Sequence, residues 1–170
     1  MVLFYELVAY DATCKKSKTG VQKMKKLIII IAAVIAVNAY SVTISTNLIK
    51  AICKVESNGK VNAKGDYSRK LKEYRAIGAF QLWKVYVDDV NNILKNSGCK
   101  KRYKYSDRYN YRKSYEMTVL YLNHYGNVYE KKTGKKATPE ILARIHNGGP
   151  KGYEKEATLE YWNKVKKEMK

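Results

Sequence analysis

The clearest pattern in the chain is a run of apolar residues at helical spacing over residues 46–57. At about 100° per residue, Leu48, Ile52 and Val55 fall on one side of a helix and the lysines fall on the other. The residues that can cap this helix are Ser45 or Thr46 at its start and Asn58-Gly59 at its end.

Four more stretches show the same helical periodicity. They are Lys84–Lys95, Ser114–Lys132, a short helix from Thr138-Pro139-Glu140 to Asn147, and a last helix that starts at Thr158. Residues 60–76 are polar and aperiodic, which indicates a long loop or a small hairpin, and residues 77–82 indicate a short extended or turn element. The pattern predicts a mostly helical α+β fold of about five helices in one domain. On the longest helix, His124 and Val128 share the apolar face, so we expect His124 to be a core histidine.

Residues 24–39 have the three-part pattern of a secretory signal. Met24-Lys25-Lys26 precedes eleven uncharged apolar residues, and small side chains follow at Val37-Asn38-Ala39. Eleven helical residues span only about 16 Å, which is short for a membrane crossing. Residues 1–23 are either an over-extended start or the cytoplasmic tail of an uncleaved anchor, and the working domain is 40–170.

The chain is strongly basic, with 34 Lys+Arg against 15 Asp+Glu and a net charge of +19. Residues 40–170 alone hold 28 basic and 13 acidic residues, a net charge of +15. Such a charge favours polyanionic partners, namely nucleic acid, anionic membranes or anionic wall polymers. An AT-biased genome would also enrich the chain in lysine.

Glu56 is an acidic side chain inside the apolar stripe of the 46–57 helix. Burial disfavours a charged carboxylate, and so does the negative end of the helix dipole, so both favour a proton on Glu56. A carboxylic acid that keeps its proton is what general-acid cleavage of a glycosidic bond requires. The competing interpretation is a glutamate paired with an arginine such as Arg75 or Arg144.

Three ordered motifs extend this hypothesis. They are Val55-Glu56-Ser57-Asn58-Gly59, Gly78-Ala79-Phe80-Gln81-Leu82 and Arg144-Ile145-His146-Asn147-Gly148-Gly149-Pro150. In this order they resemble the E-S, G-x-x-Q and A-Y-N-A-G motifs of the soluble lytic transglycosylase (SLT) domain of the lysozyme-like superfamily. Residues 143–150 and 161–165 are also similar to the end of invertebrate-type lysozymes. The resemblance covers about 47–165 and implies cleavage of peptidoglycan between N-acetylmuramic acid and N-acetylglucosamine.

The resemblance implies a role for each matching residue. Glu56 would be the catalytic acid, and Ser57 would hold its carboxylate or the substrate. Gly78 would let the backbone approach the sugar, Gln81 would donate hydrogen bonds to it, and Asn147 and Gly148 would line the cleft opposite Glu56. His146 stands where the SLT motif has tyrosine, and its ring nitrogens could hydrogen-bond similarly. Without the resemblance, Ser57 is simply the end of a helix, Gly78 a turn glycine and Gln81 an exposed amide. Asn147 and Gly148 are then only the residues that stop a helix.

The reaction that follows protonation depends on a second group. A transglycosylase uses one glutamate twice and closes an anhydro ring with the sugar's own 6-hydroxyl. A hydrolase commonly needs a second carboxylate. Asp66 is the first candidate for that group, ahead of Asp88 and Asp89, and its plain interpretation is a solvated loop residue.

The remaining chemistry is limited. Cys53 and Cys99 could form a disulfide in an exported protein, or they could be two small buried hydrophobes. Two histidines without close cysteine or aspartate neighbours argue against a metal site, and no cofactor is expected.

Three functions therefore compete: an exported peptidoglycan glycosidase, an inactive lysozyme-like module that binds the wall, and a basic nucleic-acid-binding protein. The signal argues against the nucleic-acid hypothesis. We expect a monomer whose partners are glycan strands and anionic wall polymers.

Overall fold

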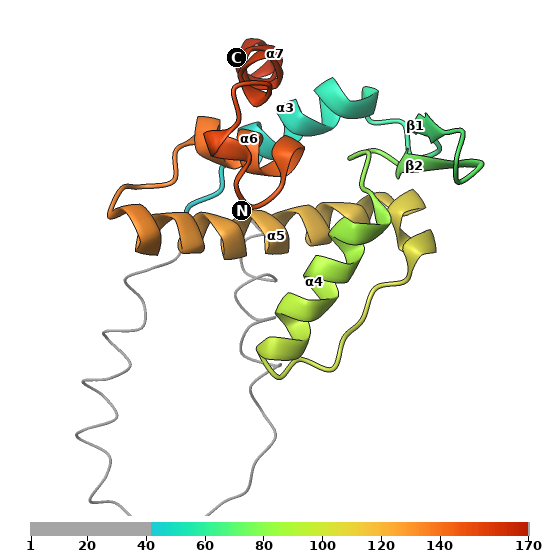
Figure 1. Cartoon of the computed structure of the whole chain (residues 1–170), viewed down its shortest axis with the longest axis horizontal. Coiled ribbons are helices and arrows are strands. Elements are labelled where there is room, and N and C mark those ends of the chain that lie inside the picture. Colours follow the sequence, from blue (N-terminus) through green and yellow to red (C-terminus); the bar gives the residue numbers. More distant parts are fainter. Residues whose placement is uncertain (1–41, 170) are drawn as a thin grey trace, which may run out of the picture.

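The computed structural model describes residues 42–169, which form five α-helices and a two-stranded antiparallel sheet (Figure 1). In chain order the elements are α3 (Thr46–Ser57), β1 (Lys64–Ser68), β2 (Glu73–Ile77), α4 (Lys84–Asn96), the 3-10 helix η1 (Tyr105–Tyr109), α5 (Tyr111–Thr133), α6 (Pro139–Gly148), the 3-10 helix η2 (Gly152–Glu154) and α7 (Thr158–Glu168). The mostly helical α+β prediction is confirmed, and the aperiodic stretch contains the small hairpin. The predicted signal over 24–39 and the segment 1–23 lie outside the described residues.

The helix ends are set by local capping. The side chain of Ser45 accepts a hydrogen bond from the backbone of Leu48, and Asn58 closes α3 in the left-handed conformation with φ 54°. At the start of α6, the Thr138 side chain accepts a hydrogen bond from the backbone of Ile141, as Ser45 does for α3. Helix bounds that depend on such neighbours are the ones that the sequence predicts best.

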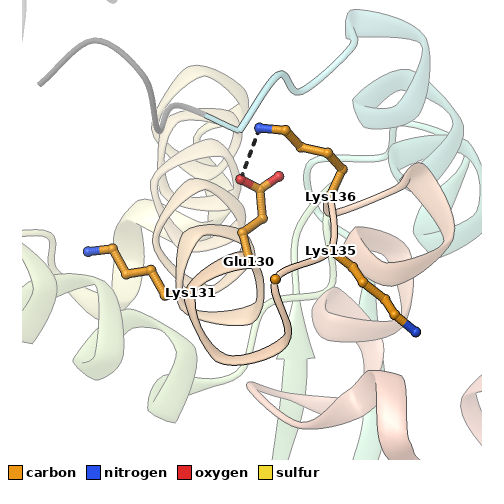
Figure 2. A pocket seen from close by; sticks show the side chains of 5 residues that line it. Glu130, Lys131, Lys135 and Lys136 are labelled. Atoms are coloured by element: carbon orange, nitrogen blue, oxygen red, sulfur yellow. Dashed lines mark hydrogen bonds and ion pairs between the residues drawn. The ribbon is translucent and has the colours of Figure 1, made fainter. Parts of the chain in front are cut away.

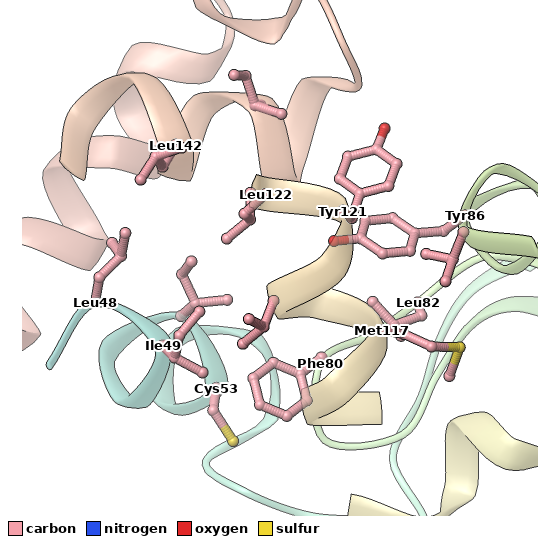
Figure 3. Close-up of a cluster of buried hydrophobic side chains, with 14 of the residues drawn as sticks. Leu48, Ile49, Cys53, Phe80, Leu82, Tyr86, Met117, Tyr121, Leu122 and Leu142 are labelled. Carbon is pink, nitrogen blue, oxygen red and sulfur yellow. The ribbon is translucent and has the colours of Figure 1, made fainter. Parts of the chain in front are cut away.

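The core lies around α5, the longest helix (Figures 1 and 3). Helices α3, α6 and α7 lie on one side of α5, and α4 packs against it from the other side. The labelled core side chains are Leu48, Ile49, Cys53, Phe80, Leu82, Tyr86, Met117, Tyr121, Leu122 and Leu142. Phe80 and Leu82 come from the turn between β2 and α4. Since burying each such side chain contributes about 1.5–3 kcal/mol, the core also fixes the turn that carries the second motif.

The predicted buried face of α5 is partly wrong. His124 is exposed, with its ring edge-on to Tyr125, and Val128 is 45% exposed. The buried face is instead centred on Tyr121, Leu122 and Tyr129. Apolar residues lie on several sides of this helix, so contacts with α4 and α6 decide which of them become buried.

Of the two alternatives for Cys53 and Cys99, the disulfide between them is not formed. Cys53 is a free thiol on α3, buried in the core (Figure 3). Burial raises the pKa of this thiol above its ordinary value, which suits a small apolar residue rather than a reactive one.

A polar cluster ties the segment before η1 to α5. Lys101 Nζ lies 2.8 Å from Glu116 Oε2, and the Tyr103 hydroxyl donates to the same oxygen at 2.9 Å. Burial alone would raise the pKa of Glu116, but these two hydrogen bonds outweigh it and hold the pKa below its ordinary value.

Among the helices of residues 42–169, none is long and apolar enough to span a bilayer.

Candidate active site

Glu56 lies near the end of α3 with its side chain 17% exposed. Its Oε1 atom accepts a 2.8 Å hydrogen bond from the hydroxyl of Tyr161 on α7. His146 Nε2, on α6, lies 3.5 Å from the same oxygen. Three helices therefore converge on one carboxylate oxygen.

The arginines expected to compete for Glu56 are bonded elsewhere. Arg75 pairs with Asp66 at 2.8 Å. Arg144 lies 3.1 Å from Glu140 in its own helix and donates to the Thr158 hydroxyl. The interpretation of Glu56 as one half of a structural ion pair with either arginine is therefore wrong.

The aromatic residues around Glu56 form a connected group, in which Tyr86, Tyr121 and His146 are buried and Tyr161 is partly buried. The Tyr86 hydroxyl lies 3.4 Å from His146 Nδ1, and the Tyr86 ring stacks on Tyr121 with centroids 3.8 Å apart. Burial, and then the charge of Glu56, raises the pKa of Tyr161 well above its ordinary value. Burial likewise raises the pKa of Tyr86, so both hydroxyls keep their protons and remain donors.

The two oxygens of Glu56 thus have different surroundings. Oε1 is occupied by the Tyr161 hydroxyl, and no hydrogen bond to Oε2 is found among residues 42–169. A carboxylic acid carries its proton on one oxygen and accepts on the other. This arrangement leaves Oε2 as the oxygen that can carry and release a proton.

The second motif is joined to Glu56 through its neighbour. Ser57 Oγ donates a 2.8 Å hydrogen bond to the carbonyl of Ala79, so the hydroxyl ties α3 to the turn and does not hold the Glu56 carboxylate. Within the turn, Gln81 Nε2 donates to the Gly78 carbonyl at 2.8 Å, and Gln81 itself has φ 47°. A non-glycine residue in this region is uncommon, and packing of its neighbours holds it there.

Gly78 is required by the protein's own backbone. It has φ 81°, and a side-chain carbon at this position would overlap the carbonyl of Arg108. The Arg108 side chain is buried and donates to the carbonyls of Arg75 and Leu82 at 3.1 and 3.0 Å. The Arg108 carbonyl on η1 therefore makes a close approach to Gly78, and Arg108, which the sequence interpretation missed, anchors the turn.

The third motif reaches Glu56 through His146, which is 8% exposed. Asn147 is exposed, and the Gly148 carbonyl accepts a 2.6 Å hydrogen bond from Lys155 Nζ. The contact with Glu56 is thus made by His146, which stands where the SLT motif has tyrosine. Tyr161 supplies the nearby phenol from another helix. Tyr161 belongs to the segment 161–165 that is similar to invertebrate-type lysozymes, and no local pattern predicts its contact with Glu56 across 105 residues.

Asp66 lies in β1 rather than in a loop, and it has φ 51°. Its carboxylate is held by Arg75, whose guanidinium lies 4.4 Å from the Trp83 ring centre. The plain interpretation is therefore wrong about the loop and confirmed about the solvent, because Asp66 is an exposed strand residue that forms a surface ion pair.

The two alternative acids lie on α4. Asp88 accepts a hydrogen bond from the Tyr105 hydroxyl at 2.9 Å. Burial, and then the charge of Asp88, raises the pKa of Asp89.

A hollow of about 420 Å³ lies at the end of α5, away from these residues (Figure 2). Glu130, Lys131, Gly134, Lys135 and Lys136 line it. Lys136 lies 3.4 Å from Glu130, whereas Lys131 and Lys135 point away from each other, so the lysines do not converge on a ligand. Within residues 42–169 no group of three or more metal-binding side chains is found.

Residues 33–165 match the family described as "Transglycosylase SLT domain". A protein named "Lysozyme" from Ostrea edulis is 31% identical over 146 residues, which cover 84% of this chain and 94% of that protein. "Invertebrate-type lysozyme 6" of Caenorhabditis elegans is 56% identical over 45 residues, covering 25% of this chain and 32% of that protein. A chain in the crystal structure of Aeromonas hydrophila PliI in complex with Meretrix lusoria lysozyme has a TM-score of 0.55 and 28% identity, over 73% of this chain and 89% of its own length.

Proposed function

Because the chain belongs to the transglycosylase SLT domain family of the lysozyme-like superfamily, we propose that it is an exported enzyme that cleaves peptidoglycan strands with Glu56 as general acid. The family makes it a lytic transglycosylase or a lysozyme-type glycosidase. Beyond the family, we propose which bond is cleaved and which residues cleave it. The bond is the one that joins N-acetylmuramic acid to N-acetylglucosamine.

The observation that carries the proposal is the unequal environment of the two Glu56 oxygens. Tyr161 donates to Oε1 at 2.8 Å, while Oε2 has no partner among residues 42–169. The side chain is mostly buried but keeps 17% of its surface exposed. Glu56 is therefore held in place on one oxygen and open on the other, as a general acid that must reach its substrate requires.

The first step is proton transfer from Glu56 Oε2 to the glycosidic oxygen as the bond to the sugar breaks. The carboxylate left behind accepts a stronger hydrogen bond from Tyr161, because a charged acceptor binds a hydroxyl more tightly than a neutral one. His146 Nε2, 3.5 Å from Oε1, can donate to the same carboxylate when Tyr86 donates to Nδ1. The group thus stabilises the charge that appears during the reaction.

Two products are compatible with this first step. In a lytic transglycosylase, the Glu56 carboxylate takes the proton of the 6-hydroxyl of N-acetylmuramic acid, which closes a 1,6-anhydro ring. In a hydrolase, water attacks instead, and Asp66 is the assigned second carboxylate. The Asp66 carboxylate lies 2.8 Å from the Arg75 guanidinium, which holds it in one orientation.

Glu56→Gln tests the acid assignment. We expect at least about a 100-fold loss in the rate of clearing purified peptidoglycan, since a positioned general acid contributes about 10²–10⁴-fold. Glu154→Gln is the matched control, because Glu154 pairs with Lys132 on the surface. A folded Glu56→Gln protein that clears peptidoglycan at the parent rate would refute the assignment.

Mass spectrometry of the released muropeptides separates the two products. Anhydro ends identify the transglycosylase, and reducing ends identify the hydrolase. If reducing ends are found, Asp66→Asn in the otherwise unchanged enzyme should abolish hydrolysis, although Glu56 is still present. A parent protein that binds peptidoglycan and releases no fragments would instead support the inactive wall-binding module.

Export rests on the signal pattern of residues 24–39, and the basic surface would help the enzyme adhere to anionic wall polymers. N-terminal sequencing of secreted protein should find Tyr40 as the first residue. Full-length protein held in the membrane would instead identify an uncleaved anchor.

A further inference from the structure

The β1–β2 hairpin presents two aromatic rings to solvent. Tyr67 and Tyr74 are register partners on the two strands and are 52% and 45% exposed. Their rings meet edge to face, with centroids 5.0 Å apart and an interplanar angle of 62°. The pairing holds both rings in place, so binding a ligand would cost them little side-chain entropy.

This pair is continuous with the second motif. A side-chain carbon at Gly65 would overlap Gln81 Oε1 and would lie 3.6 Å from the Ala76 side chain, so Gln81 covers that face of the ribbon. Ala76 and Tyr74 are two residues apart in β2 and share this face, about 7 Å apart along the strand. The exposed rings therefore extend the surface that begins at Gln81.

We propose that Tyr67 and Tyr74 form a glycan-binding subsite, which carries the substrate strand beyond the residues around Gln81. This inference rests on the proposed function. A pyranose ring offers a face of C–H groups that packs on an aromatic ring, while the phenol hydroxyls reach sugar hydroxyls at the edges. Lys64 Nζ lies 5.9 Å from the Tyr74 ring centre, where it can meet the carboxylates that peptidoglycan carries on its peptides.

The test compares single alanine variants on soluble peptidoglycan strands. We expect Tyr67→Ala and Tyr74→Ala each to raise KM by about fivefold to tenfold, with kcat unchanged, because they remove a contact made before and during the reaction. Tyr74→Phe keeps the ring face and should stay within about twofold of the parent.

Tyr105→Ala is the matched control. Tyr105 is 46% exposed with Lys84 Nζ 5.8 Å from its ring centre, but it lies on η1 rather than on the hairpin. Its KM should stay at the parent value, and thermal unfolding should show that all variants remain folded.

The outcomes separate this inference from the function on which it rests. A parent enzyme that cleaves strands while folded Tyr67→Ala and Tyr74→Ala keep the parent KM would overturn the subsite alone. A parent that cleaves nothing, yet sediments with peptidoglycan in a Tyr74-dependent manner, would overturn the function and leave the subsite standing. An unchanged KM together with lost sedimentation on phosphatidylglycerol vesicles would assign the pair to a membrane and overturn the glycan assignment.

Discussion

Replacing Tyr161 with phenylalanine removes the hydroxyl that holds Glu56 and leaves the aromatic ring in place. The lost interaction is the 2.8 Å hydrogen bond to Glu56 Oε1. The ring would still pack beside His146, with centroids 6.4 Å apart, so the helix contacts of α7 should survive. The variant thus tests how much this one donor contributes to catalysis.

The magnitude follows from the change in charge at Glu56. Before proton transfer Tyr161 donates to a neutral acid, where a hydrogen bond contributes about 0.5–1.5 kcal/mol, and afterwards to a carboxylate, where it contributes about 1.5–3 kcal/mol. Only the difference, about 1–1.5 kcal/mol, lowers the barrier. This corresponds to a loss of about tenfold in kcat for Tyr161→Phe, with little change in KM.

The assay is steady-state cleavage of soluble peptidoglycan strands, with Tyr153→Phe as control. The Tyr153 hydroxyl lies 3.4 Å from Lys132 Nζ on the surface, so its removal should not affect kcat. An unchanged kcat in folded Tyr161→Phe would show that the hydroxyl does not stabilise the developing carboxylate. A loss beyond about 1,000-fold would also contradict the reasoning, since it exceeds the contribution of one positioned hydrogen bond.

Three further predictions test the supports of the site. His146→Phe should lower kcat, and His146→Tyr should restore most of it by returning a hydroxyl to the position; equal activity of the two variants would show that no donor is needed there. Gly78→Ala should prevent folding or lower the denaturation midpoint strongly, because the added carbon overlaps the Arg108 carbonyl at φ 81°, and a parent-like midpoint in urea would contradict this packing. Glu116 has a folded pKa below its ordinary value of 4.5, so its stabilisation is present above that pH and is lost as the pH falls through the lowered pKa. Unfolding followed below pH 4.5 should show a shallower loss of stability in Glu116→Gln than in the parent, and parallel curves would refute the role of the Lys101 pair.

The helices and the inward position of Glu56 were predictable from the sequence because their signals are local. The bounds of α3 coincide with the predicted 46–57, since Ser45 and Asn58 cap the ends with their own backbone and side chains. The spacing of apolar residues also placed Glu56 on the inward side of that helix. These features depend on neighbours within about one or two helical turns, so the sequence determines them directly.

The partners of Glu56 were decided by the tertiary structure. Tyr161 is 105 residues away in the chain, and no local pattern states that its hydroxyl, rather than an arginine, reaches Oε1. The buried face of α5 was misjudged for the same reason. The free thiol of Cys53 and the contact of Gly78 with the Arg108 carbonyl likewise depend on residues far apart in the chain. Each depends on which distant surfaces pack together, and that choice is made by the free energy of the whole core.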